Sequence, residues 1–180
     1  MMNCWKSINI NKQYGKRWVN LISCFTALVT FILLYVPFSM LHQGNTVSDS
    51  GITLFLIAII LLPTLHSLLH ILPLIMINRR INLIINRKKA LPIFTFHTDA
   101  HIKKYAYILS ALAPTIVITV PGILASILFP SIHVYFLLIT SLNIGLSFLD
   151  FLIIRHILRA PKHSFVEKDE EGFDILLKAN

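Results

Sequence analysis

The sequence predicts an all-α membrane protein: a bundle of four transmembrane helices with both termini in the cytoplasm. Hydrophobic residues make up 56% of the 180 residues and charged residues only 13%, roughly half the share found in soluble domains. Apolar runs of about 20 residues, the length that crosses a bilayer, recur along the chain. The 16 lysines and arginines lie between and beside these runs. That distribution is typical of membrane topology signals and does not favour a nucleic-acid-binding surface.

The chain begins with a basic segment, residues 1–17, that contains four lysines or arginines and no acidic residue. A first membrane span is expected at 18–40. This run is too long for the apolar part of a signal peptide, and no small-residue cleavage site follows it. We therefore expect a retained span and not a cleaved leader.

A second span is expected at 52–77, long enough to cross a bilayer with some tilt. The loop that follows, 78–105, contains seven lysines or arginines. Within this loop, Ile81, Leu83 and Ile85 alternate with other residues, and residues 91–96 are rich in aromatic and β-branched side chains. A polar stretch separates them, so a small β-hairpin is one reading and an irregular loop on the membrane surface is the other.

Third and fourth spans are expected at 106–129 and 134–157, as antiparallel neighbours because the link between them is very short. The basic residues divide as four in the N-terminal segment, seven in the central loop and five from Arg155 onward. Since positively charged loops stay in the cytoplasm, the central loop and both termini are placed there. The membrane domain thus covers 18–157, and a cytoplasmic tail covers 158–180.

Three ligand-type side chains lie inside the predicted spans. His66 and His70 are four residues apart on the second span, so a helix places them on one face. Asp150, on the fourth span, is the only carboxylate in any predicted span. At about 1.5 Å per residue from the outer end of each span, His66 and Asp150 lie at similar depths of about 21 and 24 Å. These three residues are therefore expected to meet inside the bundle.

Two histidines and a carboxylate with an open fourth position are a known zinc-binding arrangement. A metal ion would remove the cost of a lone carboxylate at membrane depth, so the sequence predicts a zinc site on His66, His70 and Asp150. Asn143 and Ser147 lie seven and three residues before Asp150 and are predicted to contact these ligands or a substrate. The alternative is a set of hydrogen bonds in which Asp150 pairs with a protonated histidine.

The same residues resemble the motifs of membrane metallopeptidases. The run His66-Ser-Leu-Leu-His70 is similar to the zincin motif His-Glu-x-x-His with its glutamate replaced. The run Asn143-Ile-Gly-Leu-Ser-Phe-Leu-Asp150 resembles the segment that carries the third ligand in site-2-protease-type enzymes. Chain length, span layout and the mid-chain insert resemble a family of small bacterial membrane proteins named "putative zincin peptidases", formerly a domain of unknown function. The resemblance implies a multi-pass cell-membrane scaffold with zinc on His66, His70 and Asp150.

Ser67 stands where the zincin motif has its glutamate, the general base that activates the zinc-bound water. A serine does not accept a proton near neutral pH without another base, and no glutamate occurs in any predicted span. The sequence therefore favours a catalytically degenerate scaffold, a pseudoenzyme, that binds a metal ion or a membrane-embedded peptide or protein. The alternatives are an active metallopeptidase with an unusual base, a small metal-handling or transport protein, and a structural protein whose polar residues only join helices.

Overall fold

The computed structural model describes residues 2–42, 47–77, 82–86, 93–97, 102–168 and 172–178. The helices are α1 (Ile10–Tyr14), α2 (Lys16–Leu41), α3 (Ile52–Ile77), α4 (Lys104–Leu128), α5 (His133–Leu146) and α6 (Phe148–Leu158), with short 3₁₀ helices at Asp49–Gly51 and Pro130–Ile132. The strands are β1 (Met2–Ile8), β2 (Asn82–Asn86), β3 (Ile93–His97), β4 (Ile102–Lys103), β5 (Phe165–Lys168) and β6 (Phe173–Lys178).

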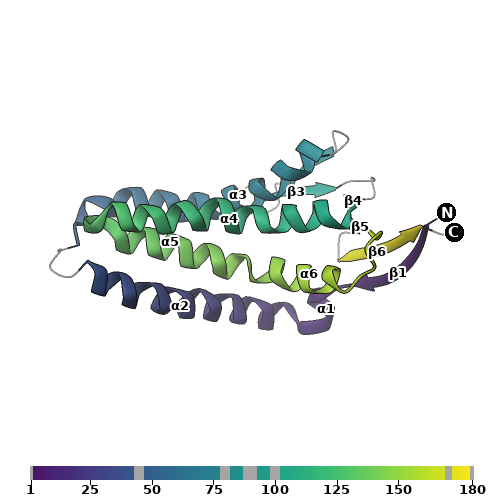
Figure 1. Cartoon of the computed structure of the whole chain (residues 1–180), viewed down its shortest axis with the longest axis horizontal. Coiled ribbons are helices and arrows are strands. Elements are labelled where there is room, and N and C mark those ends of the chain that lie inside the picture. The colour runs from purple at the N-terminus through teal and green to yellow at the C-terminus, as the bar shows by residue number, and fades with distance from the viewer. Residues whose placement is uncertain are drawn as a thin grey trace.

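The long helices form an elongated bundle, with strands gathered at one end (Figure 1). In the described ranges, α2, α3 and α4 are each long and apolar enough to cross a membrane. The 3₁₀ turn with α5, followed by α6, makes a fourth such segment that is bent by 42°. The predicted helical bundle is therefore confirmed in a coarse form, and the predicted four spans correspond to three such helices plus the bent pair. Membrane insertion and the cytoplasmic placement of the termini stay predictions.

The fourth predicted span is not one continuous helix. It divides at Ser147, between α5 and α6. The Ser147 hydroxyl donates a hydrogen bond to the Asn143 carbonyl at 3.0 Å, and Gly145 lies two residues earlier. Serine side chains that bond back to the preceding turn, and glycine–serine pairs, are common causes of helix bends. The bend lies between Asn143 and Asp150, two residues of the predicted site.

Helices α2 and α5 approach closely at Gly145. A Cβ atom built on Gly145 would lie 2.7 Å from the Cβ of Ala27 and 2.8 Å from the Ser23 carbonyl oxygen. On the other side of α5, Gly122 of α4 faces the Thr140 side chain. Small residues at such contacts let helices approach closely, as is usual in membrane bundles.

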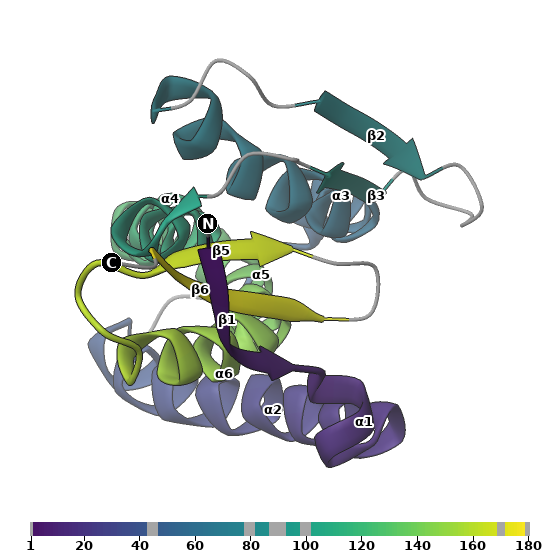
Figure 2. The ribbon, with the colours of Figure 1, turned by 90° about the vertical axis from the view of Figure 1, so that its right-hand side faces the viewer.

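The prediction of an all-α chain is wrong for the two terminal segments. They supply three strands of an antiparallel sheet with the order β1–β6–β5–β4, so the first strand pairs with the last. Figure 2 shows this sheet across the end of the bundle. The tail sequence does carry a pattern typical of a strand, since the apolar Phe173 and Ile175, both buried, alternate with the less buried Asp174. The central hairpin is confirmed as β2 paired with β3.

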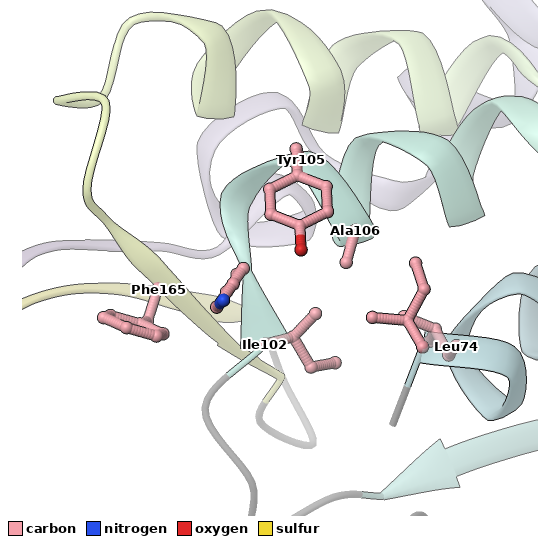
Figure 3. Close-up of a pocket in the computed structure, with 7 residues that line it drawn as sticks. Leu74, Ile102, Tyr105, Ala106 and Phe165 are labelled. Carbon is pink, nitrogen blue, oxygen red and sulfur yellow. The ribbon is translucent and has the colours of Figure 1, made fainter. Parts of the chain in front are cut away.

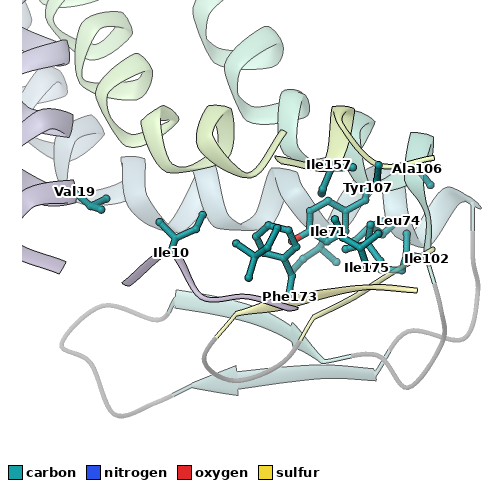
Figure 4. Close-up of a cluster of buried hydrophobic side chains, with 13 residues drawn as sticks. Ile10, Val19, Ile71, Leu74, Ile102, Ala106, Tyr107, Ile157, Phe173 and Ile175 are labelled. Atoms are coloured by element: carbon teal, nitrogen blue, oxygen red, sulfur yellow. The ribbon is translucent and has the colours of Figure 1, made fainter. Parts of the chain in front are cut away.

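The apolar core lies where this sheet meets the helices (Figure 4). Val166 and Ile175 of the sheet and Ile157 of α6 are fully buried there. Lys104, at the start of α4, donates hydrogen bonds to the carbonyls of Leu158 and Ala160, at 3.0 and 2.6 Å. These bonds satisfy one carbonyl at the end of α6 and one in the turn that follows it. The sheet is therefore packed and hydrogen-bonded to the ends of the helices.

At the opposite end of the bundle, a histidine satisfies an orphan carbonyl of α4. His42, which follows α2, donates from Nε2 to the Ser126 carbonyl at 3.0 Å. Pro130 stands four residues after Ser126 and has no N–H group, so this carbonyl lacks its helical donor. His42 thus joins the end of α2 to the end of α4.

We expect Gly145→Ala to separate α2 from α5 and to destabilise the protein by about 1–3 kcal/mol, because the new methyl group overlaps the backbone of α2. The measurement is the midpoint of thermal unfolding in detergent at one scan rate. Leu146→Ala, at the neighbouring exposed position, is the control and should change stability by less than about 0.5 kcal/mol. Equal midpoints for wild type and Gly145→Ala would contradict the close α2–α5 contact.

Candidate metal centre

His66 and His70 of α3 and Asp150 of α6 converge inside the bundle. One ring nitrogen of each histidine and one carboxylate oxygen lie within 4.8 Å of one another. Within the described ranges, no other trio of His, Cys, Asp or Glu side chains comes together in this way. The two rings are one helical turn apart, with centroids 5.0 Å from each other. The structure thus brings together the three residues that the sequence predicted as ligands.

His66 is held by an amide from α5. Its Nδ1 lies 2.9 Å from the Oδ1 atom of Asn143. The amide nitrogen of Asn143 donates to the Pro114 carbonyl at 3.1 Å and lies 3.4 Å from the Thr119 hydroxyl. Since a carbonyl can only accept, the amide orientation is fixed and Oδ1 must receive the proton on His66 Nδ1. Asn143 therefore leaves the other ring nitrogen, Nε2, as the lone-pair atom of a neutral His66.

His70 is held by a backbone carbonyl of α4. Its Nδ1 donates to the Ser110 carbonyl oxygen at 2.9 Å. In a continuous helix this carbonyl would bond the N–H of residue 114, but that residue is proline and has none. The Ser110 hydroxyl in turn donates to the His70 carbonyl. This reciprocal pair of bonds joins α3 to α4, and it leaves Nε2 as the lone-pair atom of a neutral His70.

The two Nε2 atoms face one carboxylate oxygen, Oδ2 of Asp150, at 3.2 Å from His66 and 3.4 Å from His70. With neutral rings, all three atoms carry lone pairs and none carries a proton to share. Ligands about 2.1 Å from a tetrahedral zinc ion are about 3.4 Å apart, close to both distances. A nitrogen–oxygen hydrogen bond is usually about 2.9–3.0 Å long. The donor set and its spacing fit a zinc ion.

A protonated ring is the other way to satisfy this group, because an imidazolium would donate to Asp150. Asp150 and His66 are buried, with 9% and 8% of their surfaces exposed, so the carboxylate needs a positive partner in either case. The His70 side chain keeps 19% exposure. The centre is therefore most open on the side of His70.

The remaining predicted residues lie around this group in different ways. Asn143 contacts His66 directly, as described above. The Ser147 hydroxyl accepts a hydrogen bond from Thr115 at 2.8 Å and donates to the Asn143 carbonyl, so it links α4 to the bend between α5 and α6. Ser67 is buried at 9% exposure. Metal binding by the three converging residues, and any role of Asn143 or Ser147 towards a metal or substrate, stay predictions.

The contribution of α4 was not predicted. Ser110, through its carbonyl and its hydroxyl, is the partner of His70, and Pro114 makes that carbonyl available. The sequence carried one usable signal, a serine four residues before a proline within an apolar helix. The pattern predicts an unpaired carbonyl, but it does not tell which side chain will bond it.

Comparisons with known proteins place these residues in a family. No curated protein and no solved structure matched the chain. The model of a family described as "Putative zincin peptidase" matches residues 59–165. The matched part contains His66, His70, Asn143 and Asp150, together with the hairpin and helices α4 to α6. Since the match covers more than half of the chain, this protein belongs to that family.

Proposed function

We propose that this protein is a membrane-embedded, zinc-binding member of its family that lacks the standard hydrolytic route. His66, His70 and Asp150 would hold the ion, which as a Lewis acid polarises a carbonyl or activates water in enzymes of this type. The observation that carries the proposal is the meeting of two lone-pair nitrogens and a carboxylate oxygen at 3.2 and 3.4 Å. Membership of a zincin-like family supports zinc as the ion.

The surface supports placement in a membrane. Large apolar side chains on α2 to α4 are widely exposed, such as Leu33 at 68%, Leu54 at 67% and Leu128 at 71%. Water would not favour such a surface, whereas lipid would. Basic residues, Lys6 and Lys16 among them, belong to the sheet or to adjoining helix ends, so we propose that this end and both termini face the cytoplasm.

The lack of a base argues against ordinary peptide hydrolysis. Ser67 occupies the position of the motif glutamate, and Asp150 is directed to the two histidines. The other carboxylates of the described residues, Asp49, Glu167 and Asp174, lie outside the long helices. Within the described bundle, no second carboxylate is therefore placed to act as the general base that hydrolysis would need. We therefore propose that the protein binds its partner without hydrolysing it by the standard route.

A membrane-embedded peptide or protein is the proposed partner. The hairpin β2–β3 lies against α3, the helix that carries both histidines. A hairpin offers backbone hydrogen-bonding groups at its edges, which recruit an extended peptide without demanding a particular sequence. A peptide bound there would lie beside the helix of the metal centre.

Purified wild-type protein, prepared without chelators, is expected to contain about one zinc ion per chain. His66→Ala, His70→Ala and Asp150→Asn should each lose most of it, because each removes one of three ligands. The measurement is metal analysis by mass spectrometry of the monodisperse protein. His133→Ala removes a buried histidine that bonds the Pro130 carbonyl far from the centre, and it should keep its zinc. A zinc-free wild type would contradict the proposal.

Ser67→Glu should restore a general base and produce cleavage of a membrane-anchored reporter where the wild type produces none. A positioned general base contributes about 10²–10⁴-fold to a rate, enough to detect against an inactive parent. Ser67→Gln has the same size without the base and is the matched control. Cleavage by the wild type that disappears in His66→Ala would instead support an active enzyme with an unusual base.

Asn143→Ala is expected to weaken zinc binding by about 10–100-fold, the usual cost of removing a group that orients a metal ligand. The change removes the acceptor that fixes the tautomer of His66 but no ligand atom. Competition with a chelator of known affinity measures the effect. Ser141→Ala, two residues away, removes a buried hydroxyl that bonds only its own helix in the described structure, and its zinc affinity should stay within twofold of wild type.

A further inference from the structure

A pocket outside the metal centre opens where α3 and α4 meet the sheet (Figure 3). Its volume is about 240 Å³. Its floor is apolar and almost fully buried, formed by Leu74 at 1%, Ile102 at 4% and Ala106 at 2% exposure. Tyr105, exposed at 59%, and Lys103 stand at its rim. The pocket thus joins a deep apolar floor to one cationic side chain.

The pocket lies at the end of two helices proposed to cross the membrane. Ile77 is the last residue of α3, and Lys103 directly precedes α4. With 25 residues α4 is about 37 Å long, and the hydrocarbon core of a bilayer is about 30 Å thick. The start of α4 is therefore at the level of the lipid headgroups. Tyr105 at the rim fits this level, where tyrosine rings are enriched.

Lys103 has no acidic partner in the described structure. No described carboxylate lies within ion-pair distance of its ammonium group, which sits 6.0 Å from the centre of the Tyr105 ring. Other basic side chains, such as Arg159 and Lys162, are exposed at the same end of the helical bundle. The cytoplasmic leaflet carries the anionic lipids that such an end attracts.

We infer that this pocket binds one anionic phospholipid of the inner leaflet, with an acyl segment against the exposed side chains of Ile77 and Tyr105 above the buried floor and the phosphate at Lys103. The inference rests on the membrane placement in the proposed function. Pockets for whole small molecules usually measure about 300–1,000 Å³, so 240 Å³ suits part of a lipid chain and not a complete ligand. The apolar floor favours an acyl chain, and the positive charge of Lys103 favours an anionic headgroup.

The lipid site neighbours the metal centre along both helices. Leu74 follows His70 by four residues on α3, and Ala106 precedes Ser110 by four on α4. The pocket floor and the His70–Ser110 bonds are thus one helical turn apart on each helix. A lipid in the pocket would pack beneath the bonds that orient His70, while contacting none of the three predicted metal ligands.

The test uses full-length, delipidated protein in detergent, with dioleoylphosphatidylglycerol and dioleoylphosphatidylcholine as probes and native mass spectrometry as the measurement. Wild type should bind one phosphatidylglycerol more tightly than phosphatidylcholine. Lys103→Gln should weaken phosphatidylglycerol about fivefold, the usual effect of one basic side chain near a lipid surface, and leave phosphatidylcholine unchanged. Lys162→Gln, at an exposed basic residue that does not line the pocket, is the matched control and should change binding by less than twofold.

Ala106→Trp should block the bound lipid by filling the pocket, and Lys103→Gln keeps the test valid if that variant does not fold. Glycerol 3-phosphate and oleate, added separately, should compete weakly, because each supplies half of the ligand. Strong competition by glycerol 3-phosphate would reveal a free-phosphate site and overturn the inference, as would equal binding of both phospholipids or equal effects of the two lysine variants. Zinc content of the same samples shows whether the proposed metal function fails independently.

Discussion

The structure depends on the burial of one carboxylate, Asp150, inside an apolar helical bundle. A charge in such surroundings costs several kcal/mol unless a positive partner and hydrogen bonds compensate it. Two histidines of α3 face it, and each ring is fixed by a bond from its far nitrogen to α5 or α4. Helices α3, α4, α5 and α6 therefore have to keep one mutual arrangement, since a shift of any one breaks a bond to the buried group.

Prolines supply part of this network. A proline inside a helix frees the carbonyl four residues earlier, and an unpaired carbonyl in an apolar bundle is costly. In α4, Pro114 frees the carbonyl of Ser110, and Pro130, just after the helix, leaves the carbonyl of Ser126 without a donor. His70 bonds the first carbonyl and His42 bonds the second. Pro114 and Pro130 thus each leave an acceptor at a defined depth, and a histidine bonds each one. One such histidine is a predicted ligand, and the other joins helix ends.

The features that the sequence predicted have short-range signatures. Apolar run lengths marked the helices, and the four-residue spacing of His66 and His70, with the depth of Asp150, marked the group that converges. The terminal sheet was not predicted, because β1 pairs with β6 across almost the whole chain and its strands are short beside the apolar runs. The role of Ser110 was not predicted either, because a backbone carbonyl has no residue type of its own and its partner comes from a distant helix.

The negative charge of Asp150 can be compensated by a metal ion or by a protonated histidine, so folding does not require metal binding. A single proton on either imidazole would neutralise the carboxylate without a metal, and the bonds to Asn143 and the Ser110 carbonyl would remain. The bundle can thus keep its arrangement in a metal-free form. Loss of one histidine would remove a ligand from the metal-bound form and one of the two possible positive partners of Asp150 from the metal-free form, so a fall in stability alone does not report on zinc. The bonds that fix the two rings come from Asn143 and Ser110 and not from position 67, so a serine at that position is compatible with the convergence of His66, His70 and Asp150.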